Sequence, residues 1–135
     1  MASDRIREYR DEKTVILDSS AIMMLFEFNI NLEDELTRLI GKYKIIIPKP
    51  IYEELKFLST NGKGKKNVLA KASLKLIEKY IIVDSDEKTG DDSVFSIAKQ
   101  TRGIVVTNDK ELRASLKKIS LSVIFLRAKK KLVME

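Results

Sequence analysis

The 135-residue chain contains no cysteine and no histidine. Without cysteine there is no disulfide framework and no thiol nucleophile, and nothing argues for export. Without histidine there is no imidazole base and no Ser-His-Asp triad, and the usual nitrogen and sulfur ligands of zinc are missing. Any enzyme chemistry must therefore come from carboxylates, hydroxyls, lysines and arginines. Among these groups, clustered carboxylates suit Mg²⁺ or Mn²⁺.

Long apolar runs are also missing. None approaches the roughly 20 residues that a membrane-spanning helix needs, and residues 1–13 have mixed charge and no apolar region typical of a secretory signal. We therefore expect a cytoplasmic protein with no membrane partner. The length predicts a single domain over residues 1–135, with a polar N-terminal arm at residues 1–13 and a basic C-terminal tail at residues 127–135.

Basic residues outnumber acidic ones. The chain has 26 Lys and Arg against 20 Asp and Glu, which gives a formal charge of +6 and a pI of about 9.4. A basic protein attracts the phosphate backbone of nucleic acids. Frequent Ile, Lys and Glu are also typical of heat-adapted proteins, in which the charges form a solvated surface. Charge alone leaves both interpretations open.

Short, continuous apolar runs alternate with amphipathic stretches along the chain. The runs predict strands at residues 15–17, 44–47, 80–83, 104–106 and 122–126. The amphipathic stretches predict helices at residues 21–28, 32–42, 51–59, 68–79 and 92–102, and one that begins at 107–109. A lysine-bearing loop is expected at residues 60–67. Apolar strands separated by helices predict an α/β three-layer sandwich with a central parallel sheet of about five strands.

An acidic residue follows each of the first four strands. Asp18 comes directly after the first, Glu54 lies in the second turn of the helix after the second, Asp91 follows the turn after the third, and Asp109 follows the fourth. Parallel strands joined by right-handed crossovers end at one edge of the sheet, so the four acids should share that edge. Close carboxylates repel one another unless a cation neutralises them. One or two Mg²⁺ or Mn²⁺ ions there would clamp a phosphodiester and activate a water.

Three of these acids also have a purely structural explanation. Asp18, Asp91 and Asp109 stand at predicted helix starts, where aspartate caps backbone N–H groups and faces the positive end of the helix dipole. Asp92 is a plausible cap beside Asp91. Each acid alone is therefore weak evidence for a metal site, and the interpretation depends on the four together.

Two further patterns concern the helices themselves. Asn108 with Glu111 three residues later resembles a capping box. Glu54 is predicted on the same side of its helix as the apolar Ile51, whereas Glu53 points away. An unpaired acid on an apolar face would cost several kcal/mol, so Glu54 needs a functional reason.

These motifs, taken in order, resemble the PIN-domain ribonucleases over about residues 14–126. The family motif of a strand that ends in Asp and Ser corresponds here to VILDSSA. The motif of a Pro followed by a helix with Glu-Leu corresponds to IPKPIYEEL. The family also has an Asp with an aliphatic residue three positions later and an Ala seven positions later. Here these are Asp91, Val94 and Ala98. A strand followed by Thr-x-Asp is met by IVVTND, which ends at Asp109.

The resemblance implies a metal-dependent RNA endonuclease. It implies that Mg²⁺ or Mn²⁺ is held by Asp18, Glu54, Asp91 and Asp109, with Asp92 as a further candidate. It also implies that Ser19, together with Thr107 or Asn108, contacts the substrate or orients the metal ligands.

Two branches of the family fit the sequence. The ending VIFLRAKKKLVME and the Asp91-Asp92 pair are similar to archaeal relatives of the small-subunit-processome PIN endonucleases, which process pre-rRNA. The other branch is the VapC-type toxins, which cut tRNA or rRNA and are silenced by an antitoxin. The expected partners are RNA, a second copy of the chain in a homodimer, and an antitoxin or a ribosome-assembly partner. The residues expected to bind RNA phosphates, unless they merely form a solvated surface, are Lys63, Lys65, Lys66, Arg127, Lys129 and Lys130.

Two rival classes are weighed against this interpretation. A catalytically silent PIN fold could serve as an RNA-binding scaffold, but the intact acids argue against it. A receiver-type signalling domain also has a parallel sheet with acids around Mg²⁺. It needs an acceptor Asp at the third strand, where Asp84 stands, but also paired acids at the first and a Lys at the fifth. The chain has only Asp18 and Arg127 at those two positions.

Overall fold

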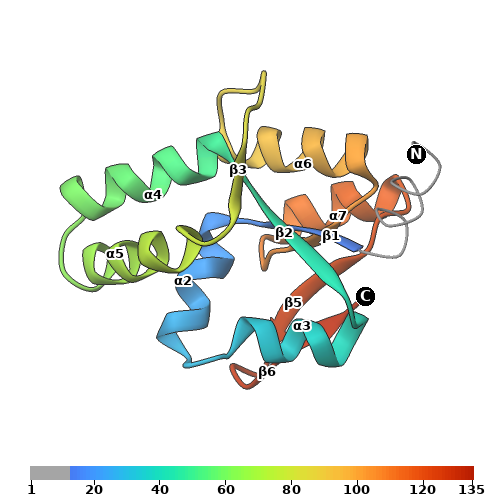
Figure 1. Ribbon diagram of the computed structural model, residues 1–135, viewed down its shortest axis with the longest axis horizontal. Helices are drawn as coiled ribbons and strands as arrows, with labels where there is room; N and C mark the ends of the chain where they lie inside the picture. Colours follow the sequence, from blue (N-terminus) through green and yellow to red (C-terminus); the bar gives the residue numbers. More distant parts are fainter. Residues whose placement is uncertain (1–12) are drawn as a thin grey trace.

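The computed structural model describes residues 13–135, so residues 1–12 of the expected N-terminal arm lie outside the description. Within it, six strands form one sheet in the order β3-β2-β1-β4-β5-β6 (Figure 1). The strands are β1 (Lys13–Leu17), β2 (Tyr43–Pro48), β3 (Ile81–Val83), β4 (Ile104–Val106), β5 (Val123–Arg127) and β6 (Lys131–Met134). The helices are α2 (Ser19–Glu27), α3 (Leu32–Ile40), α4 (Lys49–Asn61), α5 (Lys65–Ile77), α6 (Gly90–Thr101) and α7 (Lys110–Lys118).

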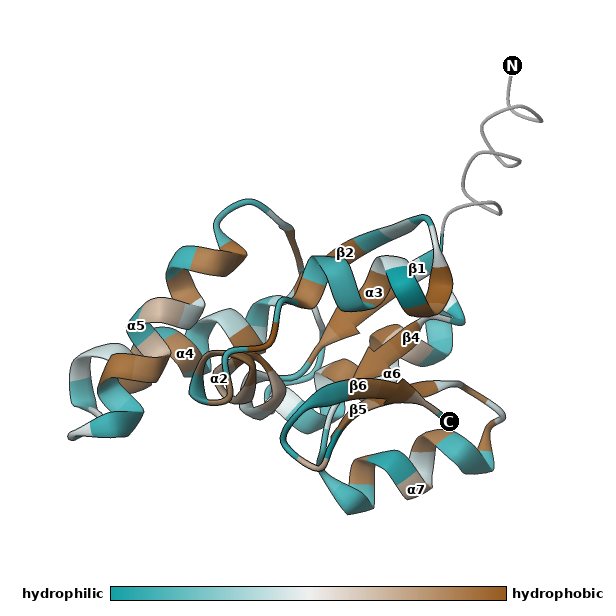
Figure 2. Ribbon diagram, turned by 90° about the horizontal axis from the view of Figure 1, so that it is seen from below, coloured by the Kyte–Doolittle hydropathy of each residue, from teal (hydrophilic) through white to brown (hydrophobic). Residues whose placement is uncertain are grey.

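The layers match the predicted α/β sandwich. The first five strands are parallel. Helix α6 packs on β1, β2 and β4 and α7 on β5, while α3 packs on β2 and β6 from the opposite face (Figures 1 and 2). Helices α4 and α5 pack on each other, and α5 also packs on α2. Among residues 13–135, no helix combines the length and the apolar character needed to cross a membrane.

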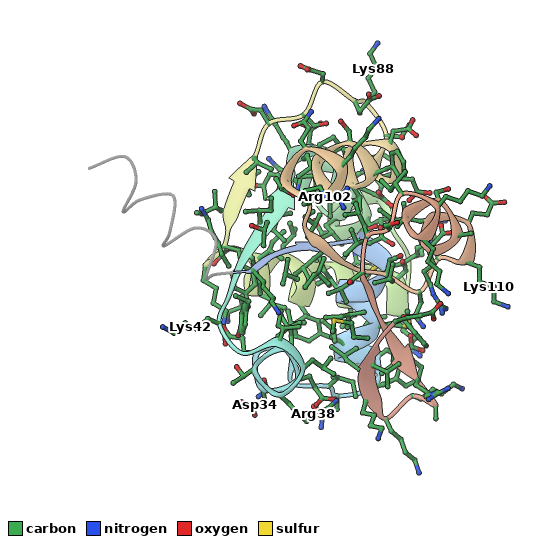
Figure 3. The ribbon with its side chains drawn as sticks, turned by 90° about the vertical axis from the view of Figure 1, so that its right-hand side faces the viewer. Asp34, Arg38, Lys42, Lys88, Arg102 and Lys110 are labelled. Carbon is green, nitrogen blue, oxygen red and sulfur yellow. The ribbon has the colours of Figure 1, made fainter. Side chains whose placement is uncertain are left out.

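Strand β1 is the centre of the core. Val15, Ile16 and Leu17 are fully buried, because β1 has a parallel neighbour on each side and helices over both faces. Figure 2 shows the apolar residues gathered on the sheet and on the inner sides of the helices. The outer side of α3 is charged. Figure 3 shows Asp34 pointing away from the sheet, whereas Arg38 reaches β6, where its Nη2 donates to the Leu132 carbonyl at 2.7 Å. A continuous apolar run predicts a buried strand, and the edge strand β3 departs from this prediction because Ile81 and Ile82 are exposed.

The order of the strands places a switch point beside β1. From β1 the chain moves outward through β2 to β3, then returns to the other side of β1 and moves outward through β4 to β5. The connections that leave the carboxyl ends of β1 and β4 therefore run in opposite directions. In open α/β sheets the crevice at such a point is where ligands bind. Asp18 and Thr107 are the first residues after these two strands.

The C-terminal segment differs from the predicted basic tail. Lys131–Met134 forms β6, which pairs antiparallel with β5, so the sheet has six strands rather than about five. Ala128 and Lys129 turn the chain in the left-handed conformation, and Leu132 is only 1% exposed. The signal was weak because the strand is four residues long, lies at the edge and begins directly after a run of lysines.

The predicted lysine loop at residues 60–67 is also wrong in its extent. Helix α4 continues to Asn61 and α5 begins at Lys65, so the connection is only residues 62–64. Lys65 and Lys66 consequently lie in the first turn of α5, and only Lys63 remains in the loop. Two glycines and two asparagines made the stretch look irregular, but residues 60–61 belong to α4 and residues 65–67 to α5.

Replacing Leu132 with alanine should destabilise the fold if β6 belongs to the core. We expect Leu132→Ala to lower the free energy of unfolding by about 2–5 kcal/mol, because a fully buried leucine leaves a cavity. Met134→Ala, at a residue of the same strand that is 45% exposed, is the matched control and should cost less than about 1 kcal/mol. Urea unfolding of both variants measures this, and equal small losses would mean that β6 does not anchor the sheet.

Candidate active site

Asp18 lies at the switch point of the sheet. Its backbone N–H donates to the carbonyl of Val106 at 3.2 Å, which joins the end of β1 to the end of β4. The residue is 4% exposed. Its carboxylate oxygen Oδ2 accepts hydrogen bonds from Ser20 Oγ and Thr107 Oγ1, both at 2.9 Å. Asp18 occupies the N-cap position of α2, but its side chain makes no capping hydrogen bond, so capping does not explain it.

Burial makes the charge of Asp18 unfavourable. The pKa of the Asp18 carboxyl is raised from its usual range chiefly by loss of solvent, and the nearby negative charge of Asp109 raises it further. Hydrogen bonds from Ser20 and Thr107 oppose this shift. The fold therefore holds a carboxylate rigidly at a place where ionisation is costly.

Glu54 reaches the site from α4. The buried stripe of that helix is Ile51, Leu55 and Ser59. Glu54 lies on the same side as Ile51, as predicted, because both side chains face Gly90, but Glu54 itself is exposed. Its carboxylate oxygen Oε1 accepts a hydrogen bond from Ser19 Oγ at 3.1 Å. Because the buried Ser19 directly follows Asp18, this hydrogen bond holds Glu54 next to Asp18.

Gly90 lets the start of α6 approach Glu54 closely. A Cβ atom added at Gly90 would lie 2.7 Å from Glu54 Oε2 and 2.9 Å from Ile51 Cδ1. These distances are shorter than real contacts of a Cβ atom, so any side chain at this position would displace the end of Glu54. Gly90 is the residue just before Asp91, and the small residue brings two of the four acids together.

Asp91 lies in the first turn of α6 and is exposed. The cap of this helix is Thr89, whose Oγ1 accepts from the N–H of Asp92 at 3.2 Å, so the capping interpretation of Asp91 and Asp92 is wrong. The pKa of Asp91 is raised, first by burial and then by the negative charges of its neighbours. In decreasing order these are Asp18, Asp109, Glu54 and Asp92. The four other acids therefore all lie close enough to act on the charge of Asp91.

Asp109 is the N-cap of α7, as the structural interpretation predicts. Its Oδ1 accepts from the N–H groups of Glu111 at 2.9 Å and Leu112 at 3.1 Å. Both bonds use the same oxygen, and Oδ2 takes no part in the cap. The Asp109 N–H donates to Thr107 Oγ1 at 3.1 Å, and the same hydroxyl donates to Asp18. The fully buried Thr107 thus sets Asp109 beside Asp18.

Asn108 is not the cap that the capping-box pattern predicts. Its Nδ2 donates to the carbonyl of Leu126 at 3.2 Å, and its Oδ1 accepts from the Leu126 N–H at 2.9 Å. The side chain therefore pairs with the backbone of β5 as an additional strand residue would. This contact holds the end of β5 next to the end of β4.

The acid quartet, Asp18, Glu54, Asp91 and Asp109, suits a hard divalent cation by ligand type and charge. Within residues 13–135, none of the four forms an ion pair with Lys or Arg. With the side-chain conformations seen in residues 13–135, no three acids are close enough together to hold a metal ion. Glu54 and Asp91 are exposed, so rotation of their side chains toward the buried Asp18 would bring oxygen ligands together.

Two of the predicted RNA-binding residues, Lys65 and Lys129, lie at the end of α2 away from Asp18. Lys65 Nζ forms an ion pair with Glu27 at 2.7 Å, and Lys129 Nζ lies 5.5 Å from the centre of the Phe28 ring. Helix α2 has nine residues and is therefore about 14 Å long, with Asp18 at its other end. The remaining predicted residues are all exposed: Lys63, Lys66, Arg127 and Lys130.

Sequence reasoning missed two residues that shape the site. Ser20, which donates to Asp18, is a second serine in the DSS motif, and only the first was considered. Gly90 gives no signal beyond its place before Asp91, because its importance depends on how α4 and α6 approach each other. Local sequence carries no record of such a contact.

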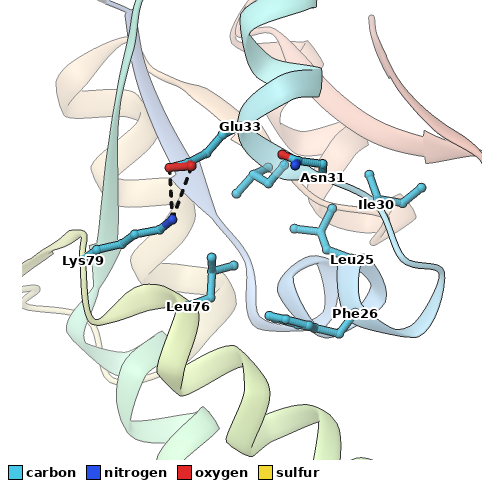
Figure 4. A pocket seen from close by; sticks show the side chains of 8 residues that line it. Leu25, Phe26, Ile30, Asn31, Glu33, Leu76 and Lys79 are labelled. Atoms are coloured by element: carbon cyan, nitrogen blue, oxygen red, sulfur yellow. Dashed lines mark hydrogen bonds and ion pairs between the residues drawn. The ribbon is translucent and has the colours of Figure 1, made fainter.

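A separate cavity of about 200 Å³ lies between α2, α3 and α5 (Figure 4). Leu25, Phe26 and Leu76 form its apolar wall, and an ion pair of 3.2 Å between Lys79 and Glu33 crosses its rim. No member of the quartet lines it. The candidate site is therefore at the switch point of the sheet and not in this cavity.

Comparison with known proteins identifies the class. The PIN-like domain family matches residues 15–129, so the chain belongs to that family. Ribonuclease VapC4 of Methanocaldococcus jannaschii is 32% identical over 120 residues, which are 86% of this chain and 92% of that protein. Ribonuclease VapC9 of Archaeoglobus fulgidus is 29% identical over 135 residues, which are 100% of this chain and 98% of that protein.

Solved structures support the same fold. The structure of the PIN domain endonuclease Utp24 matches with a TM-score of 0.76 at 22% identity and covers 90% of both chains. A domain of a functionally unknown protein from Methanocaldococcus jannaschii matches with a TM-score of 0.63 at 22% identity and covers 86% of this chain and 92% of that one. The predicted resemblance to PIN domains and the predicted fold class are thus confirmed.

Replacing Asp18 with asparagine should make the protein more stable at neutral pH. In the folded state the pKa of Asp18 is raised above its unfolded value, near 3.8. Folding is therefore penalised wherever the carboxyl is ionised, and the penalty disappears as the pH falls through the folded pKa toward 3.8. We expect Asp18→Asn to raise the unfolding midpoint at pH 7 and the difference from wild type to shrink on acidification.

Asp86→Asn, at an exposed loop position, is the matched control and should change little at either pH. Thermal unfolding at several pH values measures the difference. An Asp18→Asn variant that is less stable than wild type at pH 7 would contradict the assignment of Asp18 as a strained, buried charge.

Proposed function

We propose that this chain is a metal-dependent RNA endonuclease that uses the acid quartet. One observation carries the proposal, namely that Asp18 is a buried carboxylate at the switch point that makes no capping hydrogen bond to α2. A buried negative charge without a cationic partner persists where function requires it. Asp109 at the N-terminus of α7 acts on its charge, and Asp18, Glu54 and Asp109 all act on Asp91 of α6. The ribonuclease names of the two archaeal relatives support the choice of RNA.

The residues have distinct roles in this proposal. Asp18, Glu54, Asp91 and Asp109 would hold Mg²⁺ or Mn²⁺, with Asp92 beside them. An ion held there would supply positive charge to the phosphodiester and lower the pKa of the attacking water. Thr107 and Ser20 orient Asp18 through their hydroxyl groups, and Ser19 orients Glu54.

The basic residues at the end of α2 would hold the RNA backbone. Lys65 and Lys129 lie against the last turn of this helix from two different elements. The phosphate chain would run from this end of α2 along about 14 Å to Asp18 at the other end. At this distance from Asp18 the lysines would contact phosphates other than the scissile one.

We extend the proposal to a VapC-type ribonuclease. Support comes from the curated relatives, which are VapC ribonucleases at 32% and 29% identity over most of the chain. An antitoxin partner, a homodimer and a cytoplasmic location belong to this proposal. A role in pre-rRNA processing, with a ribosome-assembly partner, stays a prediction from the C-terminal sequence, because the likeness to Utp24 at 22% identity concerns the fold alone.

Cleavage of labelled, structured RNA tests the proposal. Wild type should cut in Mn²⁺ or Mg²⁺ and not in EDTA, and Asp18→Asn should lose at least about a hundredfold in rate, because it removes the central metal ligand. Asp86→Asn serves as the control for purity and folding. Sequencing of the new RNA ends then separates a few tRNA or rRNA sites from a pre-rRNA processing site.

Two outcomes would overturn this proposal. Cutting that survives in both EDTA and Asp18→Asn would exclude the quartet as a metal site. RNA binding without cutting under any metal would favour the scaffold alternative.

The salt dependence of RNA binding tests the basic residues. Lys129→Ala with Lys130→Ala should flatten the slope of log K against log salt by about 1.4, since each lost phosphate contact on single-stranded RNA removes about 0.7. The charge-matched control is Lys42→Ala with Lys99→Ala, at two exposed positions outside the β5–β6 turn (Lys42 is labelled in Figure 3). Equal slopes for the two double variants would make the β5–β6 turn an ordinary surface.

A further inference from the structure

A cavity of about 310 Å³ between α6 and α7 opens beside the acid quartet. It is lined by Asp91, Asp92, Phe95, Glu111, Leu112 and Ser115. Asp91 belongs both to this lining and to the quartet. A phosphodiester held by the quartet would therefore have one of its adjoining nucleosides next to the cavity.

The inner wall of the cavity is apolar. Phe95 is half-buried and Leu112 is 6% exposed, and the two come from the two helices that form the walls. Proteins bind the unstacked bases of single-stranded RNA against aromatic side chains of this kind. The wall thus offers a surface for the face of a planar ring.

The polar lining consists of hydrogen-bond acceptors. The Ser115 hydroxyl donates its proton to the carbonyl of Glu111 at 3.0 Å, so its oxygen is left to accept. The carboxylates of Asp92 and Glu111 are exposed and form no hydrogen bond or ion pair with another described side chain. No lysine or arginine lines the cavity. A base that fits here must present donors.

Guanine meets this requirement best among the four bases. Its N1–H and its N2 amino group are adjacent donors that match the two oxygens of one carboxylate. Cytosine and adenine offer one amino group each. Uracil places a carbonyl on each side of its single N–H, and a carboxylate repels both.

From this lining we propose that the cavity binds a guanine base next to the cleaved bond, with the Glu111 carboxylate as the acceptor. This specificity site rests on the proposed endonuclease function and adds the base that it selects. Glu111 is the choice over Asp92 because it lies on α7, across the cavity from the quartet ligand Asp91 on α6.

Inosine in place of guanosine tests the contact. The measured quantity is kcat/KM for the RNA that wild type cuts best, with guanosine or inosine on either side of the cut. Inosine lacks the N2 amino group, so wild type should lose about tenfold on the recognised side. Glu111→Gln should bring the ratio of guanosine to inosine close to one, and Glu78→Gln, at an exposed residue after α5, should keep the wild-type ratio.

Equal cutting of both RNAs by wild type would overturn the base site and leave the endonuclease proposal standing. A wild-type preference that persists in Glu111→Gln would remove Glu111 from the site.

Binding of mononucleotides tests the same site without any cleavage. Guanosine 5′-monophosphate should shift the amide NMR signals of residues 91–95 and 111–115 in wild type, and uridine 5′-monophosphate should shift them much less. The guanosine shifts should weaken in Glu111→Gln and persist in Glu78→Gln. Equal shifts from both nucleotides, or shifts from L-arginine amide alone, would contradict the proposal. The second result would mean that the cavity takes a cationic side chain of a protein.

Discussion

The burial of one carboxylate, Asp18, is the constraint on which the site depends. A charge that is 4% exposed is unfavourable unless something fixes and compensates it. The fold supplies two hydroxyl donors, from Ser20 and Thr107, and Thr107 also accepts the backbone N–H of Asp109. The hydrogen bonds that hold Asp18 therefore also position a second acid. A divalent cation would complete the compensation.

The burial of apolar residues in the sheet offsets the free-energy cost of this arrangement. Val15, Ile16 and Leu17 are fully buried directly before Asp18, and β1 is paired on both sides. The buried charge of Asp18 thus directly follows three fully buried residues of a central strand. Exposed acids on α4 and α6 can then turn toward a fixed ligand, which agrees with the absence of a preformed group of three acids within residues 13–135.

Periodicity and apolar runs predicted the first five strands and the order of the helices, because these features depend on local burial. They missed β6, since the pairing of Lys131–Met134 with β5 is a tertiary contact of a short, lysine-flanked segment. Capping was predicted less well. Asp109 caps α7, but Thr89 caps α6 and Asn108 pairs with Leu126 instead. Propensity allows several polar residues at a helix start, and only the packing of the neighbouring strands decides among them.

The presence of four acids at one edge could be predicted from the parallel order of the strands, but their environments could not. Glu54 does lie on the side of Ile51, but it is exposed because its carboxylate is at the edge where α4 meets the start of α6, and the buried stripe of α4 runs through Ser59 and not through the predicted Leu58. The closeness of Gly90 to Glu54 depends on how two helices approach each other. The most direct test of the account is a crystal structure with Mn²⁺, read from the anomalous signal of the metal. We predict a peak coordinated by Asp18 together with at least one more member of the quartet. Manganese bound elsewhere, with Asp18 uncoordinated, would contradict the central claim.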